Sequence, residues 1–187
     1  MKQRLQIPVR TLVEGVLRAG DLDMRFTSHG RSLEGIRIHQ QIQRQRPAGY
    51  QAEVPVSMEV QTPELVLVVG GRIDGVMETD DFTLVEEIKS TTMDLDLLAE
   101  RRDPCHWGQA KAYAYLLARE RCLEAVDVRL TYCHVDTAET VEQVEHVVFG
   151  DLKAFFRVQG HADRGDAQGL APIAVKEVQG FRGQDLV

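Results

Sequence analysis

The sequence has few of the residues and runs that define several large protein classes. Its three cysteines, Cys105, Cys122 and Cys133, are odd in number and widely spaced, which argues against a disulfide framework and against a closed four-cysteine zinc or iron–sulfur site. No apolar run approaches the ~18 residues of a membrane span, and no signal-peptide core follows the basic N-terminus. No repeat, low-complexity tract or GxxxxGK[ST] phosphate loop occurs, so ATP-driven unwinding cannot reside in these residues. The simplest prediction is a cytosolic protein with reduced thiols.

The composition is that of an ordinary globular domain with an uneven charge distribution. Of the 187 residues, 43% are hydrophobic and 27% are charged, enough to build one sizeable core. The net charge of −7 divides into about +5 over residues 1–50 and about −12 over the rest. A phosphate-binding surface is therefore best sought in the first fifty residues, although a solvated face that binds nothing gives the same charge pattern.

Two amphipathic helices are predicted in the first fifty residues. Apolar residues recur at helical spacing over Val9–Leu17, and the pattern ends at Gly20, where glycine suits a helix C-terminus. Ser32 can cap a second helix, which carries His39 and ends before Pro47.

The remainder alternates between strand and helix patterns. Short β-rich runs occupy 51–60, 65–69, 72–78 and 82–90. Helical spacing returns over 105–122, strands are predicted over 126–135 and 140–149, and Asp151 can cap a last short helix. We predict the α/β (α+β) class, with a central mixed β-sheet flanked by helices over residues 1–160 and a linker and tail over 161–187.

The segment 71–91, GRIDGVMETDDFTLVEEIKST, is the most informative. Two apolar strands flank a polar turn, and a turn centred on Asp80–Asp81 pairs Asp74 with Glu87. Directly opposed residues of an antiparallel pair have Cβ atoms ~5 Å apart, and Lys89 points to the same face as Glu87. This turn does not set the register strongly, so a slip of one or two residues remains open.

Two carboxylates and a lysine on one sheet face indicate a metal site. Their repulsion and burial are costly without a cation. Mg²⁺ or Mn²⁺ there can polarise a phosphate oxygen and acidify a water that Lys89 orients. Glu86 alternates to the opposite face and is interpreted as structural. An exposed hairpin with merely soluble charges is the alternative, which the apolar flanking strands disfavour.

The helix predicted over 105–122 carries a polar stripe. His106, Gln109 and Tyr113 recur at i, i+3 and i+7, and Gln109 and Tyr113 lie one turn apart. An amide and a phenol so placed can hydrogen-bond phosphate oxygens or an attacking water. For His106, contact with the scissile phosphate and a packing or capping role are both open.

Together these residues resemble the RecB-like branch of the PD-(D/E)xK nuclease superfamily. The resemblance spans roughly residues 32–117 and implies a restriction-endonuclease-like core and a nuclease that depends on Mg²⁺ or Mn²⁺. It implies the metal ligands His39, Asp74, Glu87 and, through its carbonyl, Ile88. It implies the catalytic residues Asp74, Glu87, Lys89, Gln109 and Tyr113. For His39, a satisfied core histidine is the alternative.

Four segments narrow the resemblance to the N-terminal nuclease domains of iron–sulfur-type superfamily 2 DNA helicases: VRTLVEGVLRAGDLD, EGIRIHQQIQ, HWGQAKAYAYLL and VRLTYCHVDTAETVE. Some members carry a four-cysteine iron–sulfur staple, which this sequence lacks, so no such cluster is expected. The terminal VKEVQGFRGQDLV resembles the glutamine motif that opens helicase modules, with Gln184 in the key position and the spacing one residue short. Either a fragment of a longer helicase or a free-standing relative is implied, and we favour the fragment.

Three functions follow, in order of preference. The first is metal-dependent hydrolysis of DNA, single-stranded or branched, in DNA repair or processing, with a covalently linked or separate helicase as partner. The second is a catalytically weak module that positions DNA for a helicase. The third is hydrolysis of a small phosphate ester, which the basic N-terminal region disfavours.

Overall fold

The computed structural model describes residues 2–17, 31–61 and 65–158. Three predictions fall outside the described residues: the helix end at Gly20, the side chain of the predicted cap Ser32, and the tail 161–187 with Gln184.

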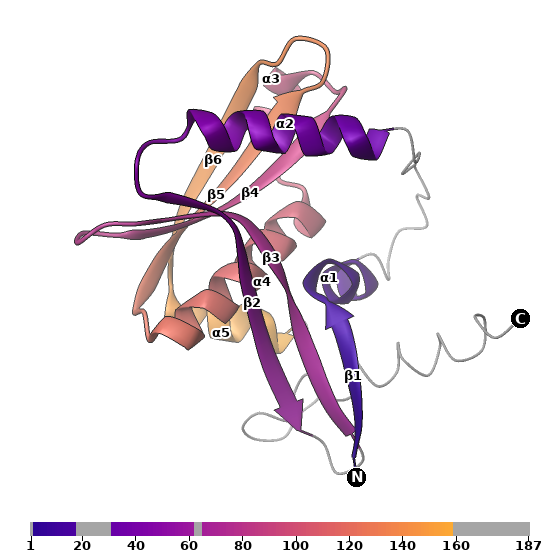
Figure 1. Ribbon diagram of the computed structural model, residues 1–187, viewed down its shortest axis with the longest axis vertical. Coiled ribbons are helices and arrows are strands. Elements are labelled where there is room, and N and C mark those ends of the chain that lie inside the picture. Colours follow the sequence, from indigo (N-terminus) through magenta and orange to yellow (C-terminus); the bar gives the residue numbers. More distant parts are fainter. Residues whose placement is uncertain (1, 18–30, 62–64, 159–187) are drawn as a thin grey trace, which may run out of the picture.

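Helices and strands are interspersed along the described chain (Figure 1). In order they are β1 (Gln3–Pro8), α1 (Val9–Leu17), α2 (Arg31–Gln45), β2 (Tyr50–Gln61), β3 (Leu65–Glu78), β4 (Thr83–Thr91), α3 (Leu95–Glu100), α4 (Pro104–Arg121), β5 (Ala125–His134), β6 (Thr140–Val148) and α5 (Phe149–Val158).

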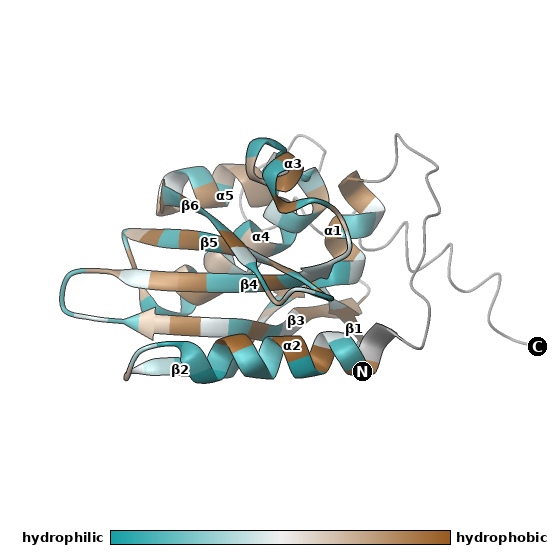
Figure 2. Ribbon diagram, turned by 90° about the horizontal axis from the view of Figure 1, so that it is seen from above, coloured by the Kyte–Doolittle hydropathy of each residue, from teal (hydrophilic) through white to brown (hydrophobic). Residues whose placement is uncertain are grey.

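One mixed sheet forms the centre of the molecule. Its strand order is β1-β3-β4-β5-β6, and β2 pairs with β3 along the opposite edge of that strand. The β1–β3 and β4–β5 pairs are parallel, and the others are antiparallel. Helix α2 lies across one face, whereas α1, α4 and α5 cover the other (Figure 2). This arrangement confirms the predicted class, a central mixed sheet flanked by helices.

The main core lies between the sheet and α4. This helix begins with the side chain of Asp103 accepting from two backbone N–H groups, and ends at Cys122 in the left-handed conformation. Its buried face is rich in alanine, with Leu116 and Leu117 almost fully buried, so the helix can approach the sheet closely. Burial of each large aliphatic side chain contributes about 1.5–3 kcal/mol. A much smaller cluster beneath α2 joins Ile38 and Ile42 to Ile88 and Cys133.

The sheet contains a local gap beside β3. Strand β1 pairs with residues 65–70 of β3, and β4 pairs with residues 75–78. Both strands lie on the edge that β2 leaves free, because β2 pairs with β3 over 66–77. Residues 71–74 therefore have no strand partner on that edge, and we call this stretch the β3 window.

The structure differs from the sequence prediction in four places. Strand β1 and helix α3 were not predicted, and the runs 65–69 and 72–78 form the single strand β3. Gly70 and Gly71 resemble a strand break in the sequence, but both pair with β2. Glycine is needed at position 70 because an added Cβ would lie 2.7 Å from the carbonyl oxygen of Val56. Asp151 is not a cap, because α5 already begins at Phe149.

No helix in the described ranges is both long and apolar enough to cross a membrane.

Candidate active site

The β3–β4 hairpin brings the two candidate carboxylates together. Its turn is closed by a hydrogen bond of 3.0 Å from the N–H of Thr79 to the carbonyl of Phe82. Gly75 pairs with Glu86, which confirms the predicted register and sets Asp74 opposite Glu87 in the next step. The β3–β4 ladder ends at Gly75, where the β3 window begins.

The carboxylate of Asp74 replaces the missing strand contact. Its Oδ2 accepts a hydrogen bond of 2.7 Å from the backbone N–H of Ile88, and its Oδ1 lies 3.2 Å from Nδ1 of His39 on α2. Burial alone lowers the pKa of His39, but the hydrogen bond to Asp74 and the charges of Asp74 and Glu87 outweigh it, so this pKa is raised. The hydrogen bond to Asp74 and the nearby negative charges thus favour the protonated form of His39.

A second chain of contacts runs from β4 to α4. Nζ of Lys89 donates to Oε1 of Glu87 at 2.7 Å and to Oε1 of Gln109 at 2.9 Å, and Gln109 also hydrogen-bonds Tyr113. The Tyr113 phenol lies over the β3 window, where a Cβ added to Gly71 would be 2.6 Å from its oxygen.

Burial dominates the electrostatics of this centre. It raises the pKa of Glu87 to about 7; the charge of Lys89 opposes the shift and that of Asp74 adds to it. Burial, assisted by the charge of Glu87, also raises the pKa of Tyr113 to about 12, so its phenol stays a hydrogen-bond donor at neutral pH. The surroundings of Glu87 thus disfavour its negative charge.

The donor set fits a hard divalent cation in its chemistry. Two carboxylates are suitable ligands for Mg²⁺ or Mn²⁺, and the imidazole of His39 lies 3.2 Å from one of them, that of Asp74. A cation would also stabilise the buried Glu87. Among the residues that the structure describes, however, no three His, Cys, Asp or Glu side chains already converge on one point, and Glu87 is turned to Lys89 instead.

The structure therefore groups all the residues singled out from the sequence except His106. The contacts above form two sets that meet at β4. One set links His39, Asp74 and Ile88. The other links Glu87, Lys89, Gln109 and Tyr113. For Ile88 the contact is made by its N–H; ligation by its carbonyl stays a prediction. His106 instead lies 3.0 Å from the Tyr132 hydroxyl.

Sequence reasoning did not find Gln43, which donates through Nε2 to the carbonyl oxygen of Asp74 at 2.8 Å. It stands four residues after His39, and that helical spacing was the one available signal.

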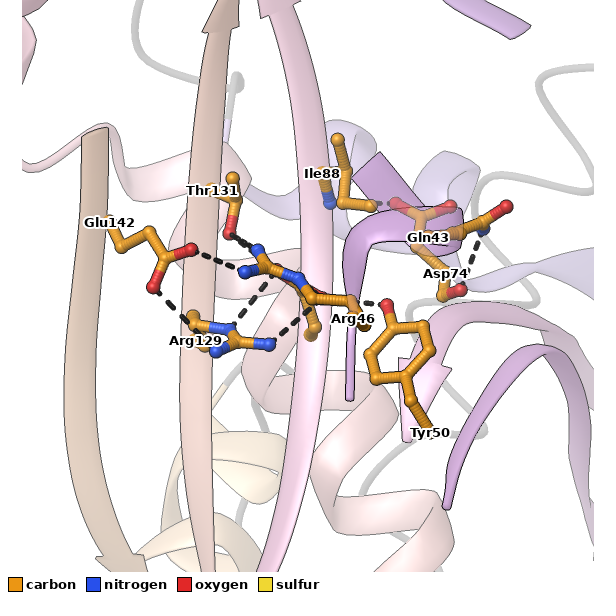
Figure 3. A network of polar contacts seen from close by, with 9 residues as sticks. Gln43, Arg46, Tyr50, Asp74, Ile88, Arg129, Thr131 and Glu142 are labelled. Carbon is orange, nitrogen blue, oxygen red and sulfur yellow. Dashed lines mark hydrogen bonds and ion pairs between the residues drawn. The ribbon is translucent and has the colours of Figure 1, made fainter. Parts of the chain in front are cut away.

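Glu86 lies on the other face of β4, as predicted, and is fully buried. Figure 3 shows Arg46, Tyr50, Arg129 and Thr131, which surround it. Glu86 accepts from Arg46, Arg129 and the Tyr50 hydroxyl, the last at 2.6 Å. Burial raises the pKa of this carboxyl, but the hydrogen bonds from Thr131 and Tyr50 and the charge of Arg129 outweigh burial, so this pKa is lowered. Gly75 makes room for these side chains, because a Cβ there would overlap the Tyr50 phenol.

Comparison with known proteins gives one family and one fold. The family model of the PD-(D/E)XK nuclease superfamily matches residues 16–180. Among solved structures, the "Crystal structure of SSO0001" resembles this chain at a TM-score of 0.53 and 18% identity, covering 85% of this chain and 77% of that one. At that identity the likeness concerns the fold alone. No curated protein matches.

Proposed function

Because the chain belongs to the PD-(D/E)XK nuclease superfamily, we propose that it is a nuclease that hydrolyses phosphodiester bonds of DNA with Mg²⁺ or Mn²⁺. The observation that carries the proposal is that Asp74 accepts from the N–H of Ile88, which lies between Glu87 and Lys89 on β4. Lys89 contacts both Glu87 and Gln109, on the helix that also bears Tyr113. Burial raises the pKa of Glu87 to about 7, and a bound cation would relieve this cost of burying its charge.

Each side chain has a distinct role in this proposal. His39, Asp74, Glu87 and the carbonyl of Ile88 hold the cation. When bound, such a cation polarises a phosphate oxygen and makes a water more acidic. Lys89 supplies a positive charge beside the attacked phosphate and orients the water.

The α4 side chains set the position of that charge. Gln109 accepts from Lys89 at 2.9 Å and so fixes the direction of its side chain. Tyr113, protonated at neutral pH, donates a hydrogen bond to a phosphate oxygen in the β3 window.

Single-stranded or branched DNA is the proposed substrate, with a linked or separate helicase as partner in DNA repair. Both rest on the resemblance to helicase-associated nuclease domains. A catalytically weak module that only positions DNA is the competing function.

Cleavage of labelled DNA separates the two functions. The chain is incubated with single-stranded, branched and duplex DNA, and with an RNA strand, in Mn²⁺ or Mg²⁺, and with EDTA as the metal-free condition. We expect Asp74→Asn and Lys89→Met each to lower cleavage at least about 100-fold. DNA binding, measured in Ca²⁺, should persist in both variants.

The matched control is Asp80→Asn, which removes a carboxylate from the exposed turn of the same hairpin and should leave cleavage unchanged. DNA binding without cleavage by the unaltered chain would support the module instead.

A further inference from the structure

Asp74 lies where strand pairing fails on both sides of β3. On one side the β4 ladder stops at Gly75. On the other side β2 pairs with β3 at Ala52 and again at Val54, but Glu53 and Asp74 do not form a ladder pair. Glu53 adopts a left-handed backbone conformation, with φ of 56°, which residues other than glycine rarely adopt. The backbone of the candidate metal ligand is therefore not held by the sheet.

Gln43 occupies this interruption. Its Nε2 donates to the carbonyl oxygen of Asp74 at 2.8 Å and to Oε1 of Glu53 at 3.3 Å, so one amide contacts both members of the missing pair. Figure 3 shows the Gln43 side chain directed at Asp74, while Ile88 holds the carboxylate of Asp74 from the other side.

Helix α2 delivers this amide in a fixed position. Gln43 follows His39 by one helical turn on the same face, so the helix contacts the carboxylate and the backbone of Asp74 at once. The helix is fastened to the sheet by Ile38 and Ile42 in the small apolar cluster and by Arg46, which binds Glu86. The position of Asp74 therefore depends on the position of α2, through the hydrogen bond from Gln43.

We propose that Gln43 is a positioning residue: its side-chain amide replaces the interrupted β2 contact and holds Asp74 in the geometry required for cation binding. The inference rests on the proposed function, since it assigns Asp74 to a metal centre. Gln43 does not touch substrate or the cation in this scheme and acts through Asp74 alone.

The test replaces Gln43 by methionine, which has a similar length and no donor, and also by alanine, a strong helix former. The control is Gln41→Met on the exposed side of α2. Without metal, hydrogen exchange at the Ile88 amide should be about fivefold faster in both Gln43 variants, as expected when one supporting hydrogen bond is lost. Calorimetric Mn²⁺ affinity should fall about tenfold, and thermal unfolding should stay close to that of the control.

The outcomes are distinguishable. If the Gln43 variants keep wild-type Ile88 exchange and Mn²⁺ affinity while Asp74→Asn loses Mn²⁺ binding, the inference is wrong and the metal centre stands. If the unaltered chain binds no Mn²⁺, the proposed metal centre fails and the inference fails with it. Faster Ile88 exchange together with weaker Mn²⁺ binding, in folded variants, supports both.

Discussion

Gly71 determines where the Tyr113 phenol can lie. An added Cβ would be 2.6 Å from its oxygen and 3.1 Å from a ring carbon, so Gly71→Ala must displace the ring and disturb its bond to Gln109. Because small displacements of catalytic groups lower rates strongly, we expect cleavage to fall between about 10- and 100-fold, measured as kcat at saturating Mn²⁺.

Gly150→Ala is the matched control, because a Cβ added at Gly150 meets no atom within 4 Å. A Gly71→Ala protein as active as the unaltered chain would mean that the Tyr113 position has no part in the reaction.

The sequence predicts those site residues whose spacing follows from local geometry. Asp74 and Glu87 share one hairpin, so a turn centred on Asp80–Asp81 predicts their register, with a slip of one or two residues left open, and the Gly75–Glu86 pair confirms it. Gln43 could not be predicted in the same way, because its partner Asp74 is 31 residues away and its role depends on a ladder interruption. The left-handed conformation of Glu53 has no signal in its residue type, since glycine or asparagine is usual there.

At the scale of elements, the Arg46–Glu86 pair fastens the C-terminal end of α2 to the sheet. Arg46 is 16% exposed and Glu86 is fully buried, and Arg46 also donates to Thr131 at 3.2 Å. Removal of one partner leaves a buried charge with less compensation. We expect Arg46→Met to lower the free energy of unfolding by about 3 kcal/mol, measured by chemical denaturation. Arg44→Met, on the exposed face of the same helix, should change it by less than about 0.5 kcal/mol; equal effects of the two substitutions would refute this role for Arg46.

The elements that escaped prediction depend on distant partners or are very short. Strand β1 pairs in parallel with residues 65–70, about sixty positions along the chain, and its own run contains only Leu5 and Ile7 as alternating apolar residues. Helix α3 has 6 residues, too few for a helical period to be recognised. The longer helices and the antiparallel strands were predicted within a few residues, since each carries its own apolar pattern. The restriction-endonuclease-like core expected from the motif residues is confirmed by the superfamily match.

For the whole molecule, the proposed function requires a chain with a net charge of −7 to bind a polyanion. Many of its cations are already paired, as Arg46, Arg102 and Arg129 are. Arg37 and Arg44 differ: both are exposed on the outer face of α2, beside a shallow depression lined by glutamines, and neither makes an ion pair within the described part of the chain. Seven residues separate them, roughly 10 Å along the helix. We expect this face to contact the DNA backbone.

Counterion release makes that expectation measurable. Each phosphate contact on a single strand contributes about 0.7 to the slope of log affinity against log salt concentration. The double variant Arg37→Ala/Arg44→Ala should therefore bind single-stranded DNA more weakly at low salt, with a slope smaller by about 1.4. The control is the double variant Arg119→Ala/Lys153→Ala, which removes two positive charges from α4 and α5. These helices cover the opposite face of the sheet (Figure 2), and the two double variants have the same net charge. If both double variants shift the slope equally, the effect comes from total charge and α2 is not the contact surface. If only the α2 variant shifts it, the strand follows the outer face of the helix whose inner face carries His39.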